Sequence, residues 1–217
     1  MTNKDIHTIF EILNEEVQQW KTPVVTVIAR KRSPFQVLVS CIISLRTKDE
    51  VTGAASRRLY AVADNPKGIL ELSEDEIAKL IYPAGFYNVK AKQILDISRA
   101  LVEDYDSVVP DTIDELIKFK GVGRKTANLV VTLGYNKPGI CVDIHVHRIT
   151  NRWGYIRAKT PDATEMALRK KLPEAYWIPI NDLLVTYGQN LCTPVSPHCS
   201  KCRMTDYCKR VGVDKSR

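Results

Sequence analysis

Two glycines and a lysine near the middle of the chain have residue types and a spacing that could do chemistry. Residues 119–126 read Phe-Lys-Gly-Val-Gly-Arg-Lys-Thr. We expect Gly121 and Gly123 to bracket a tight turn that needs positive φ. The backbone N–H groups of such a turn suit a phosphate group, especially beside a helix N-terminus. Lys125, next to Arg124, would lie in a positive field that favours its neutral amine, and a neutral amine is a nucleophile.

Four cysteines near the end of the chain form a second group with possible chemistry. They are Cys192, Cys199, Cys202 and Cys208, spaced C-x6-C-x2-C-x5-C. Zinc sites more often pair two C-x2-C knuckles, whereas iron–sulfur ligation takes four cysteines at irregular spacing. The spacing therefore predicts a metal site and leaves its type open. Another cysteine, Cys41, lies in the apolar run of residues 35–45, and we expect it to be a core residue.

The elements that must position these groups read as helices. A capping box from Thr112 to Glu115 predicts a helix over residues 112–117, and apolar spacing predicts another over 124–133 that ends at Gly134. Helical spacing also covers residues 5–20 and 34–45 and predicts a helix through Ile94, Leu95 and Leu101, with further capping boxes at 47–50 and 73–76. Residues 21–33 read as a loop. Because period-two alternation is nearly absent, the fold class is predicted to be all-α.

Composition narrows the class of partner. The 217 residues are 44% hydrophobic, which supports a packed core, and the net charge is +7 with a pI near 9.1. A basic balance fits a polyanion, although it can equally serve solubility alone. No apolar stretch approaches membrane-spanning length, and the first residues lack a signal-peptide core. We therefore expect no membrane partner, an intracellular (cytoplasmic or nucleoid-associated) location, and thiols that are ligands or core residues rather than disulfides.

The chain resembles the endonuclease III family of helix-hairpin-helix DNA glycosylases. The resemblance rests on Gly121-Val-Gly-Arg-Lys-Thr-Ala and on Val142-Asp-Ile-His, and covers nearly the whole chain. It implies that Lys125 forms a Schiff base and that Asp143 is catalytic. Asp143 would steady positive charge or assist Lys125, although an aspartate at a helix start can also be only a cap. One departure is Lys120, where a proline is usual.

The resemblance also implies a set of DNA contacts and a cofactor. The contacts are Arg46, Phe86, Lys120, Gly121, Val122, Gly123, Arg124 and His145. Arg46 and Phe86 would enter the opened duplex; without the resemblance, Arg46 is a solvated arginine and Phe86 is as readily a core residue. The family uses the C-x6-C-x2-C-x5-C spacing for a [4Fe–4S] cluster. For Lys125 the plainer alternative is a simple phosphate contact.

The implied fold has two helical lobes. The central lobe is residues 27–137; the other combines residues 1–26 with 138–217, including the cluster loop 192–208. The implied enzyme is a monomer that binds damaged duplex DNA, removes oxidised pyrimidines of the thymine-glycol type and cleaves the strand by β-elimination. The alternatives are a mismatch-specific or adenine glycosylase, whose lysine is usually replaced, and a DNA-binding module without catalysis.

Overall fold

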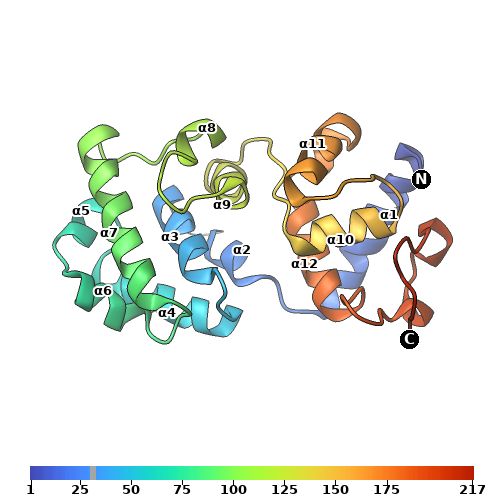
Figure 1. Ribbon diagram of the computed structural model, residues 1–217, viewed down its shortest axis with the longest axis horizontal. Coiled ribbons are helices and arrows are strands. Elements are labelled where there is room, and N and C mark those ends of the chain that lie inside the picture. The colour runs from blue at the N-terminus through green and yellow to red at the C-terminus, as the bar shows by residue number, and fades with distance from the viewer. Residues whose placement is uncertain (30–32) are drawn as a thin grey trace. The chain divides into compact units, whose positions relative to one another are not determined.

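The computed structural model describes residues 1–29 and 33–217, and within these residues every regular element is a helix (Figure 1). The all-α prediction is confirmed. The chain divides into two compact units: unit 1 is residues 1–23 with 138–217, and unit 2 is residues 24–137. The first boundary lies at Val24 rather than at the predicted residue 27. No helix in the described ranges is long and apolar enough to cross a membrane.

Unit 2 is organised around α3, one of its buried helices. Its elements are α2 (Val24–Ala29), α3 (Pro34–Ser44), α4 (Asp49–Val62), α5 (Pro66–Leu70), α6 (Glu74–Ile81), α7 (Tyr87–Asp104), α8 (Ile113–Leu116), α9 (Arg124–Leu129) and the π-helical turn η2 (Val130–Gly134). Helix α3 begins as predicted, with Ser33 and Gln36 exchanging capping bonds and Pro34 in the first turn. Residues 35–43 are all buried, and α3 packs against α2, α4, α7, α9 and η2. This helix is therefore the core to which the hairpin segment is attached.

Two local predictions in unit 2 are wrong. Helix α2 lies within the predicted loop 21–33, of which residues 30–32 lie outside the described residues. Helix α4 begins at Asp49 with Lys48 as its N-cap and no side-chain capping bond, so the predicted box from Thr47 to Glu50 does not form. The Thr47 hydroxyl instead accepts hydrogen bonds from the Gly85 amide and from Lys90. A long-range contact has displaced the local cap.

Of the two other predicted capping boxes, one forms in full and one forms in part. At the start of α6, Ser73 and Glu76 form the full reciprocal box. At α8, the Thr112 hydroxyl accepts from the Glu115 amide, which is half of the box. The Glu115 carboxylate does not return the bond, because it binds Lys118 and the Tyr105 hydroxyl instead.

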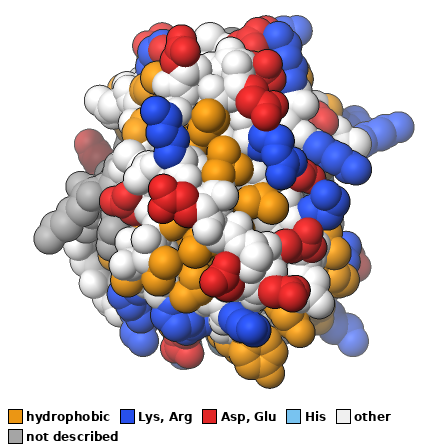
Figure 2. Space-filling model, turned by 90° about the vertical axis from the view of Figure 1, so that its left-hand side faces the viewer, with side chains coloured by type: hydrophobic (Ala, Val, Ile, Leu, Met, Phe, Trp, Pro, Cys, Tyr) orange, Lys and Arg blue, Asp and Glu red, His pale blue; other side chains and the backbone are white. Residues whose placement is uncertain are grey.

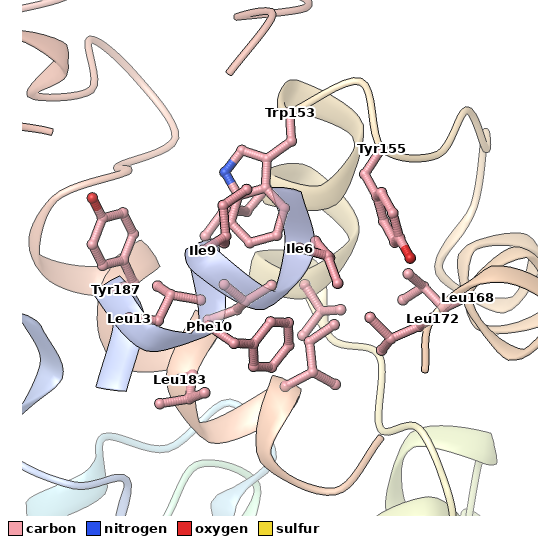
Figure 3. Close-up of a cluster of buried hydrophobic side chains, with 14 of the residues drawn as sticks. Ile6, Ile9, Phe10, Leu13, Trp153, Tyr155, Leu168, Leu172, Leu183 and Tyr187 are labelled. Atoms are coloured by element: carbon pink, nitrogen blue, oxygen red, sulfur yellow. The ribbon is translucent and has the colours of Figure 1, made fainter. Parts of the chain in front are cut away.

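Unit 1 joins the first helix of the chain to its last eighty residues. Its elements are α1 (Asn3–Glu16), η1 (Val17–Gln19), α10 (Ile144–Arg152), α11 (Pro161–Lys171), η3 (Glu174–Tyr176), α12 (Pro179–Asn190), η4 (Cys199–Lys201) and η5 (Thr205–Tyr207). Figure 3 shows the buried face of α1 packed among side chains from the later helices, including Leu183 and Tyr187 of α12. Each fully buried side chain of this kind contributes about 1.5–3 kcal/mol, so α1 is an integral part of this core.

Candidate nucleic-acid interface and cysteine site

The glycine hairpin connects α8 to α9 in unit 2. Gly121 has φ +81°, as predicted, which a residue with a side chain adopts only at a cost. Gly123 does not have positive φ: it is the N-cap of α9 with φ −92° and ψ 173°. A Cβ added there would meet nothing within 4 Å. The prediction of positive φ is therefore confirmed for Gly121 and wrong for Gly123, because an N-cap residue is extended.

Helix α7 braces this hairpin from the side. The Gln93 Nε2 donates to the Lys120 carbonyl oxygen at 3.1 Å, and a Cβ on Gly121 would lie 2.5 Å from the same nitrogen. Gly121 is thus required by its backbone angle, and a Cβ there would in addition displace the end of the Gln93 side chain. Sequence reasoning missed Gln93, since a polar residue on the exposed side of a helix carries no local signal of such a contact.

The hairpin presents two of the three amides that were expected to bind phosphate. The Val122 N–H donates to the Phe119 carbonyl at 3.0 Å, and its side chain is buried, so Val122 is a structural residue. Among the described residues, the amides of Gly121 and Gly123 have no such internal acceptor. These two amides and the N-terminus of α9 are the groups suited to an anion.

Cationic residues flank those amides along the chain. Lys120 and Lys125 are exposed, and Arg124 is half-buried. The charge of Lys125 is felt in the core beneath it, where it acts on the Cys41 thiol. Burial outweighs that charge and raises the pKa of Cys41 to about 12, which confirms Cys41 as an inert core thiol.

Arg46 and Phe86 are brought together on unit 2, as a pair of side chains on adjacent loops. The Arg46 guanidinium lies over the Phe86 ring, 5.6 Å from its centroid, and Phe86 is 61% exposed. The core alternative for Phe86 is therefore excluded. Both residues have positive φ, 52° for Arg46 and 59° for Phe86. Non-glycine residues in this region are strained, and such strain concentrates at functional sites.

Asp143 caps α10 in unit 1. Its Oδ1 accepts from the amides of His145 at 2.8 Å and Val146 at 2.9 Å, and the residue is 7% exposed. The cap predicted from sequence is confirmed. Both amides donate to Oδ1, so the cap involves one of the two carboxylate oxygens. The Nδ1 of His145 accepts from Arg148 Nη2 at 3.0 Å, which fixes the ring on the surface of α10.

All four C-terminal cysteines line one cavity. We call residues 192–208 the cysteine loop; its four thiols are unbridged, and Arg152, Tyr187 and His198 share the cavity wall. Three donors point at sulfur: the Tyr187 hydroxyl at Cys202 (3.2 Å), Arg152 Nη1 at Cys192 (3.5 Å) and the Arg210 amide at Cys208 (3.4 Å). Burial raises the pKa of the Cys192 and Cys208 thiols. Hydrogen bonds to sulfur are a feature of iron–sulfur ligation, so this donor set fits such a cluster.

The four thiols are not drawn together around one point. In the described parts of the chain, no three His, Cys, Asp or Glu side chains form a group that could hold a single metal ion. The fit to a cluster therefore rests on the shared cavity, the four thiols and the donors at their sulfurs.

Two arginines of α10 tie down the start of the cysteine loop. Arg152 donates to the carbonyls of Thr193 (2.7 Å) and Pro194 (2.6 Å). Arg148 donates to the Cys192 carbonyl at 2.8 Å. Since Asp143 begins the same helix, α10 links the capping carboxylate to the cysteine loop. Sequence reasoning missed both arginines, because their partners lie some forty residues away.

The hairpin and the fold define a class of protein. Residues 39–174 match the HhH-GPD superfamily of base excision DNA repair proteins. Endonuclease III of Thermotoga maritima is 44% identical to this chain over 180 residues, which covers 83% of this chain and 84% of that protein. Endonuclease III of Rickettsia conorii is 33% identical, with 94% of each chain covered.

Solved structures agree with these relatives. A trapped endonuclease III–DNA covalent intermediate and a non-covalent endonuclease III–DNA complex both align with a TM-score of 0.85 at 28% identity, each over 97% of this chain and at least 96% of the other. A thermostable thymine-DNA glycosylase aligns with a TM-score of 0.81 at 23% identity and shows the shared fold. The chain belongs to the endonuclease III family. It is accordingly an enzyme of base excision repair, a DNA glycosylase and AP lyase whose partner is duplex DNA.

Proposed function

We propose that this enzyme removes oxidised pyrimidines of the thymine-glycol type and then cleaves the strand on the 3′ side by β-elimination. The observation that carries the proposal is Lys125, an exposed lysine in the first turn of α9, directly after the glycine hairpin. A solved relative was trapped as a covalent intermediate with DNA, which supports covalent chemistry for this chain as well. A base in duplex DNA must leave the stack before it can be attacked, so binding and extrusion come first.

The proposed chemistry is nucleophilic catalysis by a lysine amine. The neutral Nζ of Lys125 attacks C1′ of the damaged nucleotide, and the base leaves with the electron pair of the glycosidic bond and takes up a proton. The attached sugar opens to an imine, which acidifies the C2′ proton. Loss of that proton expels the 3′ phosphate, and water finally hydrolyses the imine to restore Lys125. In this scheme the amides of Gly121 and Gly123 hold backbone phosphate without reading sequence.

Asp143 is proposed to act electrostatically in the same reaction. A fixed carboxylate placed where positive charge builds on the sugar lowers the barrier most, because it needs no reorganisation. The two amide bonds to Oδ1 supply that fixation at the start of α10. Capping and catalysis are therefore compatible roles of one side chain.

Arg46 and Phe86 are proposed to enter the opened duplex. Arginine can stack and can hydrogen-bond an orphaned base, while an apolar wedge separates base steps. Their position over one another and the exposure of Phe86 support this role. Lys120, Arg124 and His145 are proposed as further DNA contacts.

We further propose that Cys192, Cys199, Cys202 and Cys208 hold a [4Fe–4S] cluster. The support is their common cavity and the three donors aimed at sulfur. When bound, the cluster would cross-link four points of a segment whose only regular structure is two short turns. Arg148 and Arg152 hold the start of the cysteine loop against α10.

A panel of duplexes, each with one lesion, tests the substrate assignment. Single-turnover cleavage should be fastest with thymine glycol and other oxidised pyrimidines, and slow with a G·T mismatch, 8-oxoguanine or undamaged DNA. Base release should be accompanied by strand cleavage. Release of a mismatched base without strand cleavage would instead show a mismatch glycosylase. Binding without either reaction would show a DNA-binding module.

A further inference from the structure

We propose that Lys90 is a positioning residue that holds the loops carrying Arg46 and Phe86 in one fixed arrangement. The proposal rests on the proposed function, in which those two side chains enter the opened duplex. Lys90 lies on α7, one turn after its N-cap Phe86, and repeats with Ile94, Ile97 and Leu101 along the buried face of the helix. That apolar spacing is the sequence signal that could have found it.

The burial of Lys90 requires an explanation. The residue is 4% exposed, whereas lysines are almost never fully buried unless they are paired. Its ammonium group has no carboxylate partner among the described residues but donates to three oxygens: the Ile43 carbonyl at 2.7 Å, the Leu45 carbonyl at 2.5 Å and the Thr47 hydroxyl at 2.9 Å. An ammonium group has three N–H donors, so the three acceptors match it.

The acceptors belong to the end of α3 and the loop that follows it. Carbonyls in the last turn of a helix lack internal partners and carry the negative end of the helix dipole, which makes them good sites for a cation. Arg46 lies between two of the groups that Lys90 binds, the Leu45 carbonyl and the Thr47 hydroxyl. The backbone on both sides of Arg46 is thereby fixed from α7.

The same contacts reach the loop of Phe86. The Thr47 hydroxyl that Lys90 binds also accepts from the Gly85 amide at 3.1 Å. A Cβ on Gly85 would lie only 2.6 Å from the Arg46 carbonyl oxygen, so the two loops are in close contact. Lys90 therefore connects, through Thr47, the residue before Phe86 to the residues that flank Arg46.

This arrangement accounts for the strained backbone of the pair. Positive φ at non-glycine residues persists only where the surrounding structure over-determines it. Arg46 and Phe86 both have positive φ, and both adjoin groups held by Lys90 or Thr47. A shift of about 1 Å in such groups can change a rate by up to about a hundredfold. The alternative is that Lys90 only stabilises the end of α3.

The test compares Lys90→Met and Thr47→Val with the matched control Lys92→Met. Lys92 lies on the same helix, but it is exposed and pairs with Asp96. Three readouts are measured on each protein: single-turnover cleavage of a thymine-glycol duplex, fluorescence of 2-aminopurine opposite an abasic analogue, and cleavage of a single-stranded oligonucleotide with an abasic site. Only the first two require a duplex to be opened. Melting temperature reports on the fold.

We expect Lys90→Met and Thr47→Val to slow duplex cleavage by about ten- to a hundredfold and to remove most of the 2-aminopurine signal. Cleavage of the single strand should stay within about twofold of wild type, and Lys92→Met should behave as wild type throughout. A parallel loss on both substrates, or unchanged duplex cleavage in a folded variant, would overturn the proposal. If Lys90→Met does not fold, Thr47→Val decides the outcome. Failure of the proposed function is distinguishable, because wild type itself would then leave the thymine-glycol duplex uncleaved.

Discussion

The hairpin of unit 2 and the cysteine loop of unit 1 are both irregular segments, yet they are held in different ways. The hairpin is short and is shaped by local chemistry, namely the positive φ of Gly121 and the bond from Val122 to Phe119, with one added brace from Gln93 of α7. The cysteine loop has two three-residue turns and is held by Arg152 of α10, some forty residues earlier in the chain, and by Tyr187 of the preceding helix α12. A segment of the first kind is readable from its sequence; one of the second kind depends on its surroundings and on what it binds.

On one face of unit 2, the charged side chains are of both signs. On the face of unit 2 around α5, α6 and α7, Figure 2 shows basic, acidic and hydrophobic side chains intermixed. A groove of about 450 Å³ lies between α7 and the hairpin; its rim carries Lys92, Lys118 and Lys120 together with Asp96. The net charge of +7 is therefore not gathered on that face.

The largest expected effect comes from removing one cysteine. Cys202→Ser should lose most of the iron and unfold the cysteine loop, because the loop has little regular structure of its own. Iron content and hydrogen exchange of residues 192–208 measure this. The control is Cys41→Ala, which removes a buried thiol of unit 2 and should leave iron content unchanged. Wild-type protein that is colourless and contains one zinc would contradict the cluster assignment.

Substitutions of Asp143 distinguish its capping role from its proposed catalytic role. Asn caps a helix as well as Asp does, so Asp143→Asn should keep the melting temperature and DNA binding of wild type. It removes a negative charge, so single-turnover base release should slow by about 10²–10³-fold. Asp143→Ala should in addition lose about 1 kcal/mol of stability. Normal base release by Asp143→Asn would reduce the residue to a cap.

Lys90 predicts opposite pH dependences for stability and for activity. Burial lowers the pKa of Lys90 to about 8 from 10.5, and the loop that Lys90 contacts carries the exposed Arg46 and Lys48. Between pH 8 and pH 10.5 the Lys90 amine is protonated in the unfolded chain but largely neutral in the folded chain. The free energy of unfolding should therefore rise with pH in this range, relative to Lys90→Met. Duplex cleavage should fall above pH 8, because a neutral amine has two N–H donors for three acceptors.

Denaturant titration and single-turnover cleavage at pH 7 and pH 9.5 measure the two trends. Lys90→Met is the reference in both, since it cannot titrate. Parallel pH dependence of the wild type and this variant in both measurements would show that Lys90 does not change its charge in this range.

The smallest expected effects distinguish the two hairpin glycines. Gly121→Ala should cost about 1–2 kcal/mol, because alanine is strained at φ +81° and its Cβ would meet Gln93. Gly123→Ala should cost less, about 0.5 kcal/mol, since φ is negative there and the space is open, and only the preference of an N-cap for glycine over alanine is lost. Equal destabilisation in urea titrations would contradict the account of the hairpin.

Features that depend on a few neighbouring residues could be predicted from sequence. The start of α3 at Ser33 and Pro34, the capping box of α6 and the positive φ of Gly121 all follow from local chemistry. The helical class follows from periodicity over longer stretches. The nucleophilic role of Lys125 was indicated by its place beside Arg124 at the start of a helix, whereas the role of Arg46 came from the resemblance, since an arginine in a loop carries little meaning alone.

Features that depend on tertiary packing could not be predicted. Helix α2 reads Val-Val-Thr-Val-Ile-Ala, and its β-branched residues have low helix propensity; packing against α3 and α4 decides its conformation. The Thr47 cap failed because Lys90 and Gly85 use its hydroxyl. Arg152 was missed because its partners in the cysteine loop are remote in sequence.

The central claim, that Lys125 is the nucleophile, is tested most directly by borohydride trapping on a thymine-glycol duplex. Wild type should form a covalent adduct with DNA, and Lys125→Gln should form none and should cleave no strand, while it still binds the damaged duplex through the hairpin amides. Lys118→Gln, an exposed lysine paired with Glu115, is the matched control and should trap as wild type does. A trapped adduct and full strand cleavage by Lys125→Gln would contradict the account.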